Sequence, residues 1–284
     1  MPERITIAAV LALALSPLAA SGQDWREMTS FRQTADVRRL DVHVRYGAGT
    51  LRIQPSADGE LYRVGLRYDS DAFEPIAAYD DGRLEVGVDG RGRGINVRSG
   101  KSGELSLDLS PDIPLDLDLD FGAVEADLEL GGLQVERIDV ETGASDTEIS
   151  FSERNEATCE RLEISMGAAA LTARGLANAN CRVVRGEGGV GELTLEFSGD
   201  WRQDIQADLT MALGSLKIVV PENIGVRVDK DTFLTDFSGP RFSKRDGVYY
   251  SDNWDRAARK LTIDLDGAFG SIEISWIRPS AVTP

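Results

Sequence analysis

Residues 114–130 read PLDLDLDFGAVEADLEL, and this stretch decides the fold class. Leucine occupies every second position from Leu115 to Leu119, and aspartate fills the positions between. Because side chains alternate between the two faces of a β-strand, the pattern predicts a strand with one buried and one solvated face. Residues 40–46, LDVHVRY, alternate in the same way. No segment in the middle of the chain keeps the 3.6-residue period of a helix, and the best helix candidate is short, at residues 253–259.

Small or turn-forming residues recur along the chain every 21 to 24 positions. This series comprises Lys101, Gly122, Gly143, Gly167, Gly189 and Ala212. Six positions after its members stand Leu107, Leu128, Ile149, Ala173, Leu195 and Ile218. One repeat of this length cannot bury its own apolar face, whereas stacked repeats share a continuous core. The spacing therefore predicts an all-β solenoid of stacked coils, about 4.8 Å apart. A plain antiparallel sandwich would also explain the alternation, but not the constant register.

The repeat divides the chain into four segments. We expect a signal peptide at 1–22, an N-terminal β cap at 23–94, solenoid coils at 95–222, and an insertion with capping strands at 223–284. Caps are expected at both ends because an open terminal coil leaves the backbone groups of a sheet edge unpaired.

The first 22 residues, MPERITIAAVLALALSPLAASG, have the pattern of an export signal. Arg4 precedes an apolar run that is too short to span a bilayer, and small residues follow Pro17. We therefore expect an exported protein of the periplasm or the extracellular space, with an uncleaved anchor as the alternative. No later stretch is long and apolar enough to predict a transmembrane segment in the mature chain.

Composition narrows the functions that are open to this chain. It has 31 Lys and Arg against 48 Asp and Glu, a net charge of −17, which argues against nucleic acids and anionic membrane surfaces as partners. His43 is the single histidine, so neither a structural zinc site nor a Ser-His-Asp hydrolase is indicated. The aspartates of 116–120 alternate with leucine and predict a solvated acidic face, with weak calcium binding as the alternative. We expect no catalytic, cofactor-binding or metal-binding residues.

The two cysteines are spaced to pair across neighbouring coils. Cys159 and Cys181 are 22 residues apart, and each stands eight residues before a glycine of the repeat. Equivalent positions in adjacent coils lie about 5 Å apart, which is within the range for a disulfide. We therefore predict a disulfide between them, because an exported protein folds in an oxidising compartment.

The insertion at 229–259 is the best candidate for a partner-binding surface. Residues 241–260 carry a local net charge of +3 in an acidic chain, together with aromatic side chains. Basic and aromatic residues are frequent at recognition surfaces. The residues that we assign to partner binding are Arg241, Arg245, Tyr249, Tyr250 and Trp254. The alternative is that the aromatic side chains only cover the last coil.

Several longer stretches resemble a known family. They are VRRLDVHVRYGAGTLRIQP, the glycine-anchored coils, IVVPENIGVRV, and YYSDNWDRAARKLTIDLDGAFGSIEISW. They resemble the toast-rack β-strand-repeat domains, most closely the C-terminal domain of the LiaF-type regulators of the cell-wall stress response. The resemblance implies a right-handed, single-stranded β-helix-like fold without known catalytic residues. LiaF-type proteins carry several transmembrane helices before this domain and act on a membrane histidine kinase, whereas a signal peptide is predicted here.

These observations favour a non-enzymatic, exported envelope protein. We expect a scaffold or interaction module, linked to the envelope stress response or to adhesion, whose partner is an envelope protein or a cell-surface glycan. The alternative is a β-helix protein that binds or cleaves polysaccharides. The short connections between coils argue against cleavage, because they leave little room for the walls of a catalytic groove.

Overall fold

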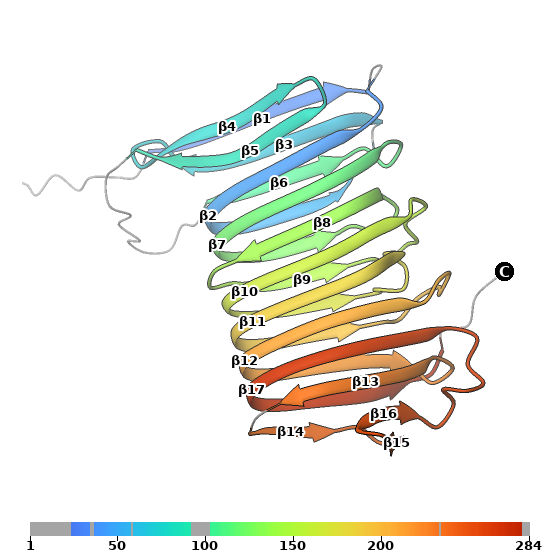
Figure 1. Cartoon of the computed structure of the whole chain (residues 1–284). Helices are drawn as coiled ribbons and strands as arrows, with labels where there is room; N and C mark the ends of the chain where they lie inside the picture. Colours follow the sequence, from blue (N-terminus) through green and yellow to red (C-terminus); the bar gives the residue numbers. More distant parts are fainter. Residues whose placement is uncertain (1–23, 35–36, 58, 92–102, 233, 280–284) are drawn as a thin grey trace, which may run out of the picture.

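The computed structural model describes residues 24–34, 37–57, 59–91, 103–232 and 234–279. Within these ranges the chain is a stack of β-strands joined in one hydrogen-bonded sheet, with no α-helix (Figure 1). The prediction of an all-β protein is confirmed. The expected helix at 253–259 is wrong: this stretch forms turns, in which the N–H groups of Arg256 and Ala257 donate to the carbonyl of Asn253. The predicted signal peptide and Lys101 lie outside the described residues.

Six long strands form the body of the stack. They are β2 (Leu40–Pro55), β7 (Pro114–Glu129), β10 (Cys159–Arg174), β11 (Cys181–Glu196), β12 (Ile205–Pro221) and β17 (Lys260–Ile277). The remaining coils are each built from two shorter strands. These pairs are β5 (Arg83–Gly90) with β6 (Glu104–Leu109), β8 (Gln134–Thr142) with β9 (Asp146–Ser150), and β13 (Gly225–Thr232) with β14 (Thr235–Ser238).

Each long strand bends near its middle and contributes to two faces of the stack. The first half of β7 pairs in parallel with β8, and its second half pairs with β9. The bends lie at the predicted glycines, and packing explains why. A Cβ atom at Gly189 would stand 2.6 Å from the carbonyl oxygen of Gly167 in the preceding coil. At Gly191 the backbone has φ +135°, and a Cβ atom would lie 1.9 Å from the carbonyl oxygen of Ala169.

The apolar columns predicted from the repeat form the core. Strand pairing aligns one column in the order Leu107, Ile53, Leu128, Ile149, Ala173, Leu195, Ile218, Ile274. Every member of this column is fully buried. The inward orientation predicted for the position six residues after the bend is therefore confirmed, and the parallel register excludes the antiparallel sandwich.

The coils do not follow the order of the chain at either end of the stack. Strand β2 lies between β7 on one edge and β5 and β6 on the other. Strand β17 likewise lies between β12 and the pair β13 and β14. The first and last long strands are therefore inner coils, although 23–94 and 223–284 were expected to be terminal caps. The physical reason is that a long strand inside the stack pairs along both of its edges, whereas a long strand at the end would leave one edge unpaired.

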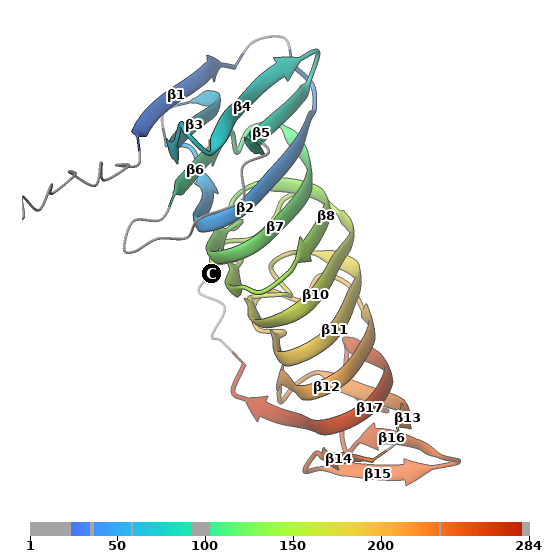
Figure 2. The same cartoon turned by 90° about the vertical axis from the view of Figure 1, so that its left-hand side faces the viewer.

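Antiparallel strands occupy the two ends of the stack (Figure 2). At one end, β1 (Trp25–Gln33) pairs with β3 (Glu60–Asp69), and β4 (Phe73–Asp80) pairs with β5. At the other end, β15 (Phe242–Arg245) and β16 (Val248–Ser251) form a hairpin, and β16 also pairs with β13. Across the described ranges, no helix is long and apolar enough to cross a membrane.

Candidate functional site

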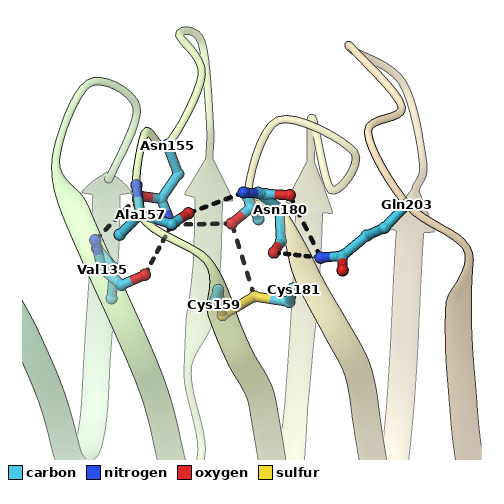
Figure 3. Close-up of a disulfide and its surroundings, with 8 residues drawn as sticks. Val135, Asn155, Ala157, Cys159, Asn180, Cys181 and Gln203 are labelled. Carbon is cyan, nitrogen blue, oxygen red and sulfur yellow. Dashed lines mark hydrogen bonds between the residues drawn. A yellow bond between two sulfur atoms is a disulfide. The ribbon is translucent and has the colours of Figure 1, made fainter.

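The two cysteines form the predicted disulfide (Figure 3). Cys159 and Cys181 are direct partners in the parallel pairing of β10 with β11, and their Cα atoms are 4.2 Å apart. Both side chains are fully buried. The bond therefore ties two adjacent coils together within the core, and its burial argues for a structural role.

A network of amides joins the loops beside the disulfide (Figure 3). The side-chain amide of the buried Asn155 donates to the carbonyls of Val135 (2.7 Å) and Ala179 (2.9 Å). Its Oδ1 accepts from the N–H of Val135 at 3.1 Å. In the next loops Asn180 donates to the carbonyl of Ala157, and the side chain of Gln203 donates to the carbonyl of Asn180. We did not predict this network, although amide residues recur in successive loops of the sequence.

The C-terminal hairpin β15–β16 has an inner face that extends the core. Tyr249 packs on Phe237, with ring centroids 4.9 Å apart, and Phe242 packs on Trp276 at 5.7 Å. The indole N–H of Trp276 donates to the carbonyl of Pro240 at 2.9 Å. These four rings contact the buried core of the stack. Tyr249 thus lies among aromatic side chains that pack against the core at this end of the stack.

The outer face of the same hairpin combines aromatic rings with cations. Tyr250 and Trp254 meet edge to face, with ring centroids 5.6 Å apart. The guanidinium of Arg245 lies 5.4 Å from the centre of the Tyr250 ring, and the ammonium of Lys260 lies 4.8 Å from that of Trp254. Both rings are half-buried. Because neighbouring residues in a strand point to opposite faces, Tyr249 and Tyr250 belong to different surfaces.

The two arginines assigned to partner binding form exposed ion pairs. Arg241 lies 2.9 Å from Glu222, and Arg245 lies 3.3 Å from Asp255. The arginine side chains are 54% and 53% exposed. Such pairs contribute little free energy in water, so an acidic group on a partner can replace the carboxylate of either pair. Of the five predicted residues, Arg241, Arg245, Tyr250 and Trp254 are accessible at this end of the stack, and Tyr249 lies on the inner face.

Carboxylates form a ladder along one outer face of the stack. Asp118 pairs in register with Asp139, which pairs with Glu163. Partial burial, together with the neighbouring charges of Glu163 and Asp118, raises the pKa of Asp139. Among the described residues, no group of three or more His, Cys, Asp or Glu side chains is arranged to hold a metal ion.

Comparison with known proteins places this architecture in a family. The family model described as the N-terminal domain of toast_rack, DUF2154, matches residues 21–174, more than half of the chain. The chain belongs to the toast-rack family. The closer resemblance to LiaF-type regulators stays a prediction. No curated protein matches this toast-rack chain.

Several solved structures resemble this toast-rack chain at low identity. A "putative cell adhesion protein" from Clostridium sporogenes is 14% identical, with a TM-score of 0.46, and the match covers 89% of this chain and all of that one. A "putative adhesin" from Bacteroides fragilis is 14% identical, with a TM-score of 0.33, over 89% of this chain and 97% of that one. A "putative lipid binding protein" from Parabacteroides distasonis is 10% identical, with a TM-score of 0.29, over 91% and 98%. Likenesses this weak carry no information about function.

Proposed function

We propose that this chain is a non-enzymatic, exported interaction protein of the cell envelope. In this proposal the stack is a right-handed scaffold whose end strands cap its open edges, and the outer face of the hairpin binds a partner. The observation that carries it is the grouping of Tyr250 and Trp254 with Arg245 and Lys260 at the end of an acidic stack. Export is supported by the buried disulfide, because such bonds persist mainly outside the cytoplasm, and by the predicted signal peptide.

The basic side chains at this end of the stack indicate an acidic partner. Arg241 and Arg245 offer guanidinium groups that bind carboxylates or phosphates in a two-pronged geometry. The aromatic rings supply apolar contact area beside them. An envelope protein or a cell-surface glycan that carries acidic groups fits this combination. A role in adhesion or in the envelope stress response belongs to the same proposal.

The polysaccharide-cleaving alternative has less support. A groove of about 570 Å³ is lined by Asp120, Glu141 and Glu187, and no basic side chain lines it. His43 lies on an outer face, where its Nδ1 atom is 2.9 Å from Asp118. Neither arrangement pairs a nucleophile with a base, which favours a binding role over a catalytic one.

Charge reversal of the two arginines tests the proposal. The mature chain, as bait for an envelope extract, should capture a component that Arg241→Glu with Arg245→Glu no longer captures. The matched control is Arg174→Glu with Arg202→Glu. This pair changes the net charge equally at two exposed ion pairs on the stack, with Glu148 and Glu156.

The melting temperatures of both double variants should stay close to that of the parent chain, because each variant changes only exposed ion pairs, and the like charges that it introduces can separate in water. Loss of capture in the first variant alone would support the proposal. Equal capture by both variants would place the binding surface elsewhere on the molecule.

A further inference from the structure

A column of exposed apolar side chains runs along the bend of the last long strands. Val190 pairs in register with Leu213, and Leu213 pairs with Phe269. These side chains are 50%, 50% and 48% exposed. Ala168 precedes Val190 in the same register, so the column grows from small to large residues toward the C-terminal end of the stack.

Leu234 extends this column by one step. It immediately precedes Thr235, which pairs in register with Gly270, the residue that follows Phe269. Leu234 is 69% exposed and has φ +46°, a conformation that costs free energy for a non-glycine residue. Of the five large apolar side chains that are exposed in the described part of the chain, four belong to this apolar column: Val190, Leu213, Leu234 and Phe269. A clustered and exposed apolar set indicates a binding surface.

Acidic side chains border the apolar column, on both sides at Val190 and on one side at Phe269. Glu187 and Glu192 flank Val190, and Asp266 precedes Phe269 by three residues. The groove of about 570 Å³ runs beside the column over the preceding coils, and Asp120, Glu141 and Glu187 line it. Residues 103–232 contain 27 Asp and Glu against 10 Lys and Arg, so this stack carries the negative charge of the whole molecule. A partner for this surface must therefore bring apolar side chains flanked by positive charge.

The spacing of the column matches that of a helix. Neighbouring strands lie about 4.8 Å apart, and one turn of an α-helix rises about 5.4 Å. A helix laid along the bend would thus offer one apolar residue to each member of the column. Over the three steps from Val190 to Leu234 the mismatch stays below about 2 Å. Lysine or arginine on the flanks of that helix would face the acidic borders.

We propose that the apolar column and its acidic borders form a docking surface for a basic amphipathic helix of a partner polypeptide. This surface is separate from the outer face of the hairpin, because it lies on the bends of β11, β12 and β17 and at Leu234, and shares no residue with that face. Apolar contact supplies the binding free energy, and the acidic borders select against acidic helices.

Three synthetic peptides of about 14 residues test the proposal by fluorescence anisotropy with the mature chain. The first carries leucine on one helical face and lysine on its flanks, the second replaces each lysine by glutamate, and the third has the composition of the first in scrambled order. The first peptide should bind at least about tenfold more tightly than the other two. Equal binding of the scrambled peptide would show only attraction to the net charge and would overturn the proposal.

Paired variants locate the binding. Leu213→Ser with Phe269→Ser should weaken binding of the first peptide by about tenfold or more, because two exposed apolar contacts are lost. Phe31→Ser is the control: Phe31 is 56% exposed on β1 at the other end of the stack, and its replacement should leave binding unchanged. Unchanged binding in the double variant, or equal loss in the control, would overturn the proposal.

Two further measurements cover the remaining outcomes. If the double variant does not fold, Glu187→Gln with Glu192→Gln replaces it. This variant should reduce both the affinity for the first peptide and the dependence of that affinity on salt. An unchanged affinity and salt dependence would overturn the proposal. The oligomeric state is measured by sedimentation. A parent dimer that does not bind the peptide, and that dissociates on Leu213→Ser with Phe269→Ser, would assign the column to a second copy of the chain and overturn the helix proposal.

Discussion

Leu195 stands in the middle of the buried column, between Ala173 and Ile218. Leu195→Asp would place an unpaired carboxylate in a fully buried position, so we expect a loss of about 4–5 kcal/mol or more and no stable fold. Asp118→Asn, on the outer face, should change the free energy of unfolding by only about 0.5 kcal/mol. Thermal and urea unfolding of the two variants give the comparison, and similar melting would show that the inward and outward faces are misassigned.

Two glycines of the bends allow a matched test of backbone geometry. Gly191 has φ +135°, and a Cβ atom there would lie 1.9 Å from a carbonyl oxygen, whereas a Cβ atom at Gly47 would meet nothing within 4 Å. Gly191→Ala should therefore cost about 2 kcal/mol or more, through strain and steric overlap. Gly47→Ala should be neutral or slightly stabilising. Urea unfolding measures both, and a Gly191→Ala protein as stable as its parent would contradict the geometry of the bend.

At the scale of strands, the sequence could predict which side chains face inward but not which strands are neighbours. The alternation in residues 114–130 and the constant spacing fix the buried positions, because both reflect local geometry. The place of β2 between β6 and β7 depends instead on which strands are neighbours. The local pattern cannot predict this, because every repeat presents the same one. Alternation along a strand also predicts that Tyr249 and Tyr250 face opposite sides, provided that residues 248–251 are recognised as a strand.

The disulfide between β10 and β11 closes a loop of 22 residues. Replacing both cysteines by alanine should lower the free energy of unfolding by about 3–4 kcal/mol in the chain-entropy account of cross-links. A reducing agent should destabilise the parent chain by a similar amount and leave the double variant unchanged. Thiol titration of the non-reduced, denatured protein checks the bond itself, and two free thiols would contradict it.

The carboxylate ladder across β7, β8 and β10 determines the direction in which the contribution of Asp139 to stability changes with pH. Its pKa is raised above the ordinary value of 3.8 by burial and by the charges of Glu163 and Asp118. The ionised form is thus less favourable in the folded state, so stability falls as the pH rises through the folded pKa. We expect Asp139→Asn to raise the melting temperature at pH 7, and the difference to disappear below about pH 3.8.

The contribution of Glu129 to stability should change with pH in the opposite direction. Burial favours a higher pKa, but hydrogen bonds from Ser150, Ser152 and the N–H of Gly131 lower it overall. Glu129→Gln should therefore destabilise the protein at pH 7, and this loss should shrink as the pH falls through the folded pKa. Parallel pH profiles for Asp139→Asn and Glu129→Gln would contradict these assignments.

At the scale of the whole molecule, the ends of the chain are interleaved with the coils of the stack. Strand β17 completes the inner coil between β12 and β13, so β13 and β14 are synthesised before the strand that pairs with both of them. Pairings between strands so distant in sequence generally form slowly, because loop closure costs entropy before the contacts form. The last coil is therefore expected to form only after the chain is complete.

Removal of β17 tests this dependence. A chain that ends at Arg259 would leave β12 without its partner on one edge, and would deprive β13 and β14 of their shared neighbour. It would also lose five buried side chains: Leu261, Ile263, Leu265, Ile272 and Ile274. We expect this chain to lose protection from hydrogen exchange from β12 onward, while β7, β10 and β11 keep theirs, since their pairings do not involve β17. A control chain that ends at Arg278, just after β17, should melt like the parent, and a chain ending at Arg259 that did the same would show that the interleaved strand is dispensable.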